Sequence, residues 1–178
     1  MIFLPSRGRR NRLEDFFRDS RPALPGRVLI DDDDDSYVGM VLPDGWEFMV
    51  GERVGCSGSV SRAFAMFPDE PFYGCVSDDI IFSAGWDETL AAACQPAFVA
   101  WGNDGRWGDK LCTSYFVGGD LVRAVGFLMA PGFGHLYTDR VWWEIADMAG
   151  LKRYHGEVAA THHNVHDRTY RERRKAGD

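Results

Sequence analysis

Two adjacent aspartates, Asp78 and Asp79, lie between two apolar stretches of the chain, residues 72–76 and 80–82. Carboxylates in such surroundings do not belong to a solvated face, and a buried carboxylate needs a partner. A divalent cation shared with a diphosphate would neutralise the pair, and such cations prefer oxygen ligands. A carboxylate that caps the following turn is the alternative. We expect a metal site at Asp78 and Asp79.

Five consecutive aspartates, residues 31–35, directly follow the apolar run 28–30. Their mutual repulsion costs stability unless solvent, cations or backbone donors offset it. Asp31 and Asp32 stand at the exit of a buried strand, where a carboxylate can accept the N–H of a pyrimidine or bind a ribose hydroxyl. A solvated turn is the simpler interpretation of Asp34 and Asp35. The spaced D-x-D-x-D-G pattern of a calcium loop is absent.

Three later side chains have two interpretations each. Asp139 begins a predicted helix, so it could cap that helix or act as a general base toward an acceptor hydroxyl. His162 and His163 follow the last predicted strand and could complete the shell of a cation. From spacing alone, ordinary hydrogen-bonded side chains are the favoured interpretation of both histidines.

The elements that must position these groups alternate between short apolar runs and helical patterns, which is typical of an α/β domain. The pattern predicts strands at residues 2–4, 27–30, 46–50, 72–76, 97–101 and 158–161. It predicts helices at residues 11–21, 59–67, 85–94, 118–129 and 139–149. Ligands of such sheets bind beyond the carboxyl ends of the strands. Polar groups follow five of these ends, so we expect one shared crevice formed by residues 5–9, 31–35, 78–79, 103–104 and 162–163.

The composition is that of one globular domain. The chain has 178 residues, 45% of them hydrophobic, and a formal net charge of −7, which does not favour a nucleic-acid-binding protein. No apolar run approaches the ~18 residues of a membrane span, and the N-terminus is too short for a signal peptide. The four cysteines stand singly in or beside apolar sequence. We therefore expect buried free thiols and a cytoplasmic protein.

The order of these motifs resembles the GT-A glycosyltransferases, in particular the family 2 type and its short phage and bacterial relatives. That family's first strand ends in a Pro-Ser/Thr-Arg segment, similar to Pro5-Ser6-Arg7. Its second strand ends in an aspartate that recognises the base, which matches Asp31 or Asp32. A helix with a Gly/Ser-rich start follows, here with Arg62, and then an x-D-D motif, here Ser77-Asp78-Asp79. The segments 85–87 and 118–123 resemble the family's structural and acceptor-side segments.

The resemblance implies a single GT-A domain, Rossmann-like with a central mostly parallel sheet, over residues 1–166, and a basic, polar tail at residues 167–178. It implies inverting sugar transfer from a UDP-sugar or a similar donor to an acceptor hydroxyl. Asp79 would hold Mn²⁺ or Mg²⁺, Asp78 would assist, His162 or His163 would be a late ligand, and Asp139 would be the base. The remaining implied donor contacts are Pro5, Ser6, Arg7, Asp31, Asp32 and Arg62.

The acceptor stays open between a saccharide, a protein, a lipid-linked sugar and a hydroxylated DNA base. Arginines cluster at both ends of the chain, in residues 7–12 and 168–175, and could contact phosphate, although solvated termini explain them equally well. The phage relatives make modification of a DNA base, in the host cytoplasm, one hypothesis. The alternatives are a nucleotidyltransferase that releases pyrophosphate and a non-catalytic nucleotide- or sugar-binding module. The oligomeric state is left open.

Overall fold

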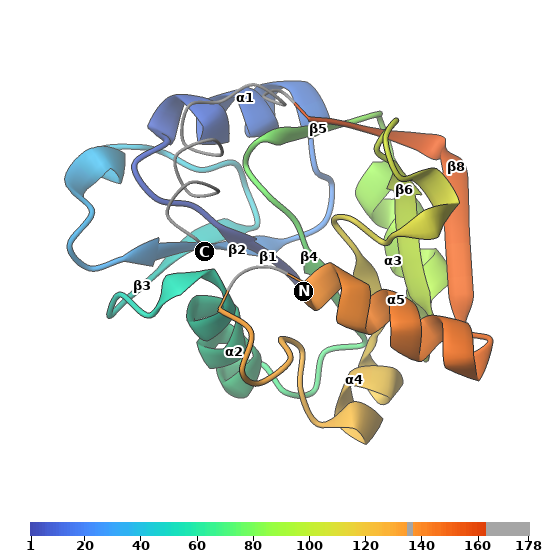
Figure 1. Cartoon of the computed structure of the whole chain (residues 1–178). Helices are drawn as coiled ribbons and strands as arrows, with labels where there is room; N and C mark the ends of the chain where they lie inside the picture. Colours follow the sequence, from blue (N-terminus) through green and yellow to red (C-terminus); the bar gives the residue numbers. More distant parts are fainter. Residues whose placement is uncertain (135–136, 163–178) are drawn as a thin grey trace, which may run out of the picture.

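A computed structural model describes residues 1–134 and 137–162. Among these residues, one mixed sheet has the strand order β3-β2-β1-β4-β7-β6-β8-β5 (Figure 1). Its strands are β1 (Ile2–Pro5), β2 (Gly26–Asp31), β3 (Trp46–Gly51), β4 (Phe72–Cys75), β5 (Ile80–Phe82), β6 (Val99–Asn103), β7 (Phe116–Gly118) and β8 (Lys152–His162). The helices are α1 (Arg10–Ser20), α2 (Gly55–Met66), α3 (Trp86–Cys94), α4 (Gly119–Val125) and α5 (Thr138–Ala149), with 3₁₀ turns at Asp35–Tyr37 and Gly108–Lys110.

The strand directions bring most carboxyl ends to one edge of the sheet. β1 pairs in parallel with β2 and β4, β2 with β3, and β6 with β8. β7 is antiparallel to both β4 and β6, so β6 runs in the same direction as β4. β5 is antiparallel to β8. The predicted α/β domain with a mostly parallel sheet is therefore confirmed, and the carboxyl ends of β1, β2 and β4 lie side by side.

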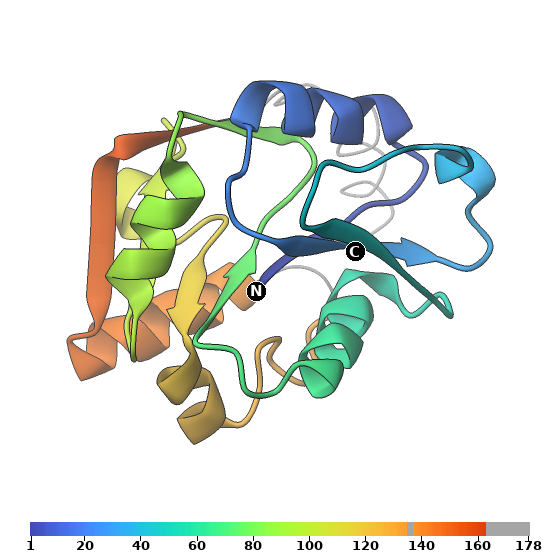
Figure 2. The ribbon, with the colours of Figure 1, turned by 180° about the vertical axis from the view of Figure 1, so that it is seen from behind.

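Helices cover both faces of the sheet, because the strand residues alternate between two cores. Ile2 and Leu4 of β1 pack in a cluster with buried residues of α1 and α3. Phe3 points to the opposite face, into a cluster with buried residues of α2, α4 and α5. The result is three layers, with α1 and α3 on one face and α2, α4 and α5 on the other (Figures 1 and 2).

α1 is anchored by its apolar face and by its last residue. Leu13 and Phe16 are fully buried, and the Phe16 ring lies 6.1 Å from Trp86 and 6.2 Å from Trp46, centroid to centroid. Ser20 ends the helix; its hydroxyl accepts the backbone N–H of Phe82 at 3.0 Å, and its carbonyl accepts the Trp86 indole N–H at 3.0 Å. These contacts fix α1 against β5 and α3, and with it the loop between β1 and α1.

Asp87 in α3 is a buried structural carboxylate. It is fully buried and accepts the backbone N–H groups of Ala23 and Leu24, each at 2.7 Å. Two charge-assisted hydrogen bonds offset part of its desolvation and hold the segment before β2 against α3. Asp87 therefore has a structural role in the contact between α3 and the segment before β2.

The sequence prediction missed three strands or parts of strands for identifiable reasons. The first half of β8, residues 152–157, is largely exposed and polar, so the apolar pattern showed only its second half. β5 and β7 have three residues each. The helix predicted after the Gly118-Gly119-Asp120 cap starts where expected, because Gly118 is the N-cap of α4, but it ends early, at Val125 before the left-handed Gly126 (φ 86°).

The other helices and strands lie within a few residues of their predicted ranges; α2 starts at Gly55, four residues before the predicted start. No helix in the described part of the chain combines the length and the apolar character that a membrane span needs.

Candidate functional site

The loop after β1 and the loop after β4 meet at Ser6 and Asp78. Ser6 is buried, and its hydroxyl lies 2.5 Å from Asp78 Oδ2 and 2.6 Å from the Tyr37 hydroxyl. The Tyr37 hydroxyl also accepts the backbone N–H of Arg9 at 3.2 Å. A buried hydrogen-bonded network of this kind is rigid, since each polar group would be costly without its partners. It joins the carboxyl ends of β1, β2 and β4.

Asp78 is a buried carboxylate facing an arginine. It is 1% exposed, and its Oδ1 lies 2.7 Å from Arg9 Nη2. This oxygen accepts no hydrogen bond of regular geometry from the described residues. Burial raises the pKa of Asp78 to about 6, and the charge of Arg9 and the Ser6 hydrogen bond act against that rise. The Arg9 guanidinium is thus the charged group in contact with this buried oxygen.

Asp79 is the accessible member of the pair. Its side chain is 32% exposed, Oδ1 accepts the Ser77 hydroxyl at 2.5 Å, and Oδ2 lies 3.7 Å from Arg9 Nη1. Neighbouring oxygens of this kind, one buried and one open to solvent, fit the donor set that Mg²⁺ or Mn²⁺ takes in proteins. Within residues 1–134 and 137–162, no three His, Cys, Asp or Glu side chains gather into a metal-binding group. A cation here would complete its shell with phosphate oxygens and water.

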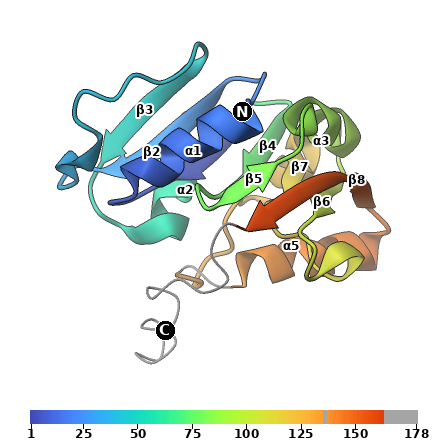
Figure 3. The same cartoon turned by 90° about the horizontal axis from the view of Figure 1, so that it is seen from above.

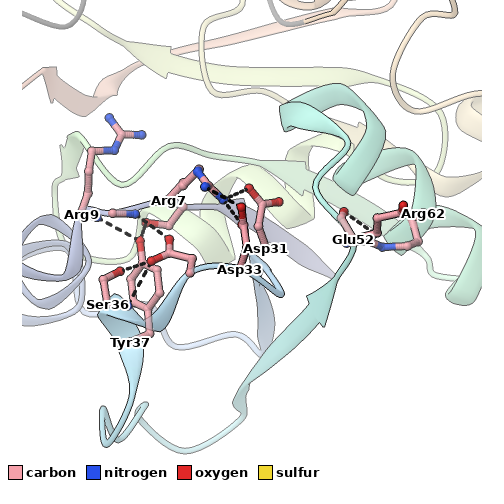
Figure 4. Close-up of polar contacts among 11 residues, drawn as sticks. Arg7, Arg9, Asp31, Asp33, Ser36, Tyr37, Glu52 and Arg62 are labelled. Carbon is pink, nitrogen blue, oxygen red and sulfur yellow. Dashed lines mark hydrogen bonds and ion pairs between the residues drawn. The ribbon is translucent and has the colours of Figure 1, made fainter.

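Arg7 clamps the aspartate run. Its guanidinium contacts Asp31 Oδ2 at 2.6 Å and Asp33 Oδ1 at 2.5 Å, as Figure 4 shows. The hydrogen bonds from Arg7 lower the pKa of Asp33. The backbone N–H of Gly8 donates to Asp34 Oδ2 at 2.7 Å. A cation and a backbone donor from the β1–α1 loop thus offset the repulsion among these aspartates.

A cavity of about 240 Å³ opens beside the aspartate run. Its lining combines carboxylates with apolar and aromatic side chains, namely Ile30, Asp31, Asp32, Asp34, Asp35, Tyr37, Val38, Phe48 and Val50. The rings of Tyr37 and Phe48 lie 5.9 Å apart. Flat apolar walls with a few polar groups are typical of small-ligand sites, and this volume is below the roughly 300 Å³ at which drug-sized sites begin. The cavity is thus open and acidic, with four aspartates and two aromatic rings in its lining.

Arg62 approaches the same region from the other side of the sheet. It projects from α2, and its Nη1 donates to the Glu52 carbonyl at 2.9 Å (Figure 4). Its guanidinium packs on Gly51 at the end of β3, where an added Cβ would lie 2.4 Å from Arg62 Cζ. Gly51 in turn accepts the backbone N–H of Asp32 at 2.9 Å. Arg62 therefore lies behind Asp32 rather than with Arg7.

The three predicted site residues late in the chain are His162, His163 and Asp139. His162 ends β8 and pairs with Ile80, the residue after Asp79, in the β5–β8 ladder seen from above in Figure 3. His163 lies outside the described residues, as does the tail at residues 167–178. Asp139 is the second residue of α5, and its Oδ1 accepts the backbone N–H of Arg140 at 2.8 Å. The N-cap position belongs to Tyr137, so the capping interpretation of Asp139 is wrong.

The loop 103–110 organises itself around Asp104. That carboxylate accepts the backbone N–H groups of Arg106, Trp107 and Gly108 at 2.7–3.1 Å and the Thr113 hydroxyl at 3.2 Å. These bonds give Asp104 a structural task within its own loop. Hydrogen bonds and an ion pair thus join the loops after β1, β2 and β4, whereas the cavity is lined by the end of β2, the loop after it and β3.

Arg9 and Tyr37 are the site residues that sequence reasoning missed. Arg9 appeared only as one member of an arginine-rich N-terminus, and nothing in the sequence separated it from Arg7, Arg10 and Arg12. Tyr37 lies two residues after the aspartate run, and the sequence does not distinguish it from an ordinary apolar residue. Their contacts with Ser6 and Asp78 depend on how three loops meet in space.

Comparison with known proteins gives matches of fold. No family model matches the chain, and no curated protein matches it. A mannosyltransferase from Pyrobaculum calidifontis, in complex with GDP-Man and Mn²⁺, gives a TM-score of 0.71 at 14% identity, over 97% of this chain and 59% of its own. The present chain thus spans less than two-thirds of that protein.

Two further structures match over most of their own length. The homologue of Mycobacterium tuberculosis Rv0371c from Mycobacterium sp. strain JC1 gives a TM-score of 0.58 at 17% identity, over 90% of this chain and 84% of its own. A Bacillus anthracis protein named as a glucose-1-phosphate thymidylyltransferase, in complex with a sucrose, gives 0.56 at 12% identity, over 99% and 95%. The chain therefore has the GT-A-like fold that its motif order resembles.

Proposed function

We propose that this chain is a metal-dependent glycosyltransferase that moves a sugar from a nucleotide-sugar to an acceptor hydroxyl. One observation carries the proposal: Asp78 and Asp79 meet Ser6 and Arg9 at the carboxyl edge of the sheet. The acidic cavity lies directly beside them, since Tyr37 belongs to both groups. A nucleotide can then place its base in the cavity and its diphosphate at the aspartate pair. The likeness in fold to a mannosyltransferase with GDP-Man and Mn²⁺ supports this arrangement.

In this proposal Asp79 is the direct ligand of Mn²⁺ or Mg²⁺, because its carboxylate is the accessible one. The cation supplies charge that stabilises the diphosphate leaving group. Asp78, fixed by Ser6, assists through ribose or water. His162, beside Ile80, is the histidine available to the same edge.

The nucleoside is assigned to the cavity. Asp31 and Asp32 are proposed to accept base N–H or ribose hydroxyl groups, with Arg7 holding Asp31 in place. Arg62 packs on Gly51, whose carbonyl accepts the Asp32 N–H, and so supports the backbone around Asp32. The donor is a UDP-sugar by motif resemblance, and a GDP-sugar is the second donor to test because of the mannosyltransferase.

The acceptor side is assigned to the start of α5. Asp139 is proposed as the base that deprotonates the acceptor hydroxyl, with inversion at the sugar. A hydroxylated DNA base gains no support from the N-terminal arginines, because Arg7 and Arg10 are in ion pairs with acidic residues of the chain and Arg9 lies at the proposed diphosphate site. The acceptor is therefore proposed only as a hydroxyl.

The test is release of nucleotide from a panel of nucleotide-sugars. Wild type should release nucleoside diphosphate from one donor in the presence of Mn²⁺, and EDTA should abolish the release. Asp79→Asn should lower the rate at least a hundredfold, since it removes the proposed metal ligand. Asp44→Asn, which removes an exposed carboxylate from the loop before β3, is the control and should keep the wild-type rate. Absence of nucleotide release and of any nucleotide-dependent rise in melting temperature would refute the proposal.

A nucleotidyltransferase is the second candidate, favoured by the likeness in fold to the Bacillus anthracis protein over nearly the full length of both chains. It would use the same sheet edge and cation with a nucleoside triphosphate and a sugar phosphate. The two reactions differ in their products. Pyrophosphate formed from a nucleoside triphosphate would replace the glycosyltransferase assignment with this one.

A further inference from the structure

Arg9 occupies the position from which a metal ion would neutralise the aspartate pair. Its two terminal nitrogens reach different carboxylates, Nη2 to Asp78 at 2.7 Å and Nη1 to Asp79 at 3.7 Å. The chain therefore supplies its own counter-ion to the proposed metal site. A cation that binds Asp79 Oδ2 would stand next to this guanidinium, and two like charges at such a distance repel each other.

The Arg9 side chain can move away from the aspartate pair while the other contacts of the site stay in place. The Arg9 side chain is 41% exposed, whereas its backbone N–H is held by the Tyr37 hydroxyl. Asp78 is fixed from its other side by Ser6. A guanidinium pairs with phosphate oxygens in a two-pronged geometry, so a diphosphate offers Arg9 a partner to replace the carboxylates.

We propose that Arg9 sets the order of binding. The divalent cation binds Asp79 only together with the nucleoside diphosphate, whose phosphate oxygens then pair with the Arg9 guanidinium in place of the carboxylates. This inference rests on the proposed function. In the proposed function Asp79 is the direct protein ligand of the cation, so phosphate oxygens of the diphosphate would supply further ligands. Arg9 is thus a donor-binding residue that also excludes free metal.

The test measures Mn²⁺ binding from the electron paramagnetic resonance signal of free Mn²⁺. Wild type, Arg9→Ala and Arg10→Ala are titrated alone and with UDP or GDP. Arg10 is the matched control, since it carries the same charge one residue away and pairs with Glu14 instead. Arg9→Lys restores a cation at the position, and the melting temperature of each variant reports whether it is folded.

Without nucleotide, Arg9→Ala should bind Mn²⁺ about tenfold more tightly than wild type, which corresponds to roughly 1.4 kcal/mol of relieved competition. Arg10→Ala and Arg9→Lys should behave like wild type. With nucleotide, wild type should bind Mn²⁺ tightly, and Arg9→Ala should bind the nucleotide more weakly than wild type does.

Equal Mn²⁺ affinity of nucleotide-free wild type and Arg9→Ala would overturn the inference, even if both bind Mn²⁺ with nucleotide as the proposed function requires. Absence of Mn²⁺ binding in every combination would overturn the proposed function as well.

Discussion

The Asp78 carboxylate is buried, so water cannot solvate it and its charge carries a desolvation cost. Ser6 and Arg9 offset part of that cost, and burial still raises the pKa of Asp78 to about 6. Asp79, one residue later, keeps an oxygen toward solvent. The two aspartates therefore have different roles. Asp78 fixes the loops, and Asp79 is open to a ligand.

The buried Asp78 should leave a signature in the pH dependence of stability. Its pKa of about 6 in the folded chain lies above the ordinary value of 3.8, so the folded chain holds the extra proton between these values. The free energy of unfolding should therefore fall as the pH rises from 4 to 7, by at most roughly 3 kcal/mol from this group.

Asp78→Asn should remove that part of the slope in urea denaturation without divalent cations. Asp44→Asn, at an exposed loop position, controls for the loss of one charge. Parallel stability curves for wild type and Asp78→Asn across pH 4–7 would contradict the burial argument.

At the scale of elements, the strand that precedes the aspartate pair is held between two neighbours. β4 pairs with β1 and with β7, and β7 passes directly into α4 at Gly118 and Gly119. A Cβ at Gly118 would lie 2.2 Å from the carbonyl oxygen of Pro96 and 2.4 Å from that of Cys94. Both contacts are with backbone, so a side chain there has no flexible neighbour to displace.

Gly118→Ala should lower the free energy of unfolding by about 1–3 kcal/mol, the usual cost of overpacking a well-packed position. Chemical denaturation followed by circular dichroism measures this change. Gly134→Ala is the matched control, because an added Cβ there meets no atom within 4 Å. A stability of Gly118→Ala equal to that of Gly134→Ala would show that this strand-to-helix junction can relax.

For the whole molecule, the sequence predicted an α/β domain with a mostly parallel sheet but not the contacts within the candidate site. Apolar runs followed by aspartates identified β2 and β4, because parallel strands place their carboxyl ends at one edge. The sequence could not show which of the four N-terminal arginines contacts Asp78, since the contact of Arg9 depends on where the β1–α1 loop turns. The polar half of β8 was missed because its residues face solvent.

The most direct measurement is a crystal structure with Mn²⁺ and UDP or GDP, with the metal located by its anomalous scattering. We expect one Mn²⁺ peak at coordination distance from Asp79 and from the diphosphate, the base in the cavity lined by Asp32 and Phe48, and Arg9 turned from Asp79 to phosphate. A nucleotide bound away from the carboxyl edge of β1, β2 and β4, or a diphosphate without a metal at Asp79, would contradict this expectation.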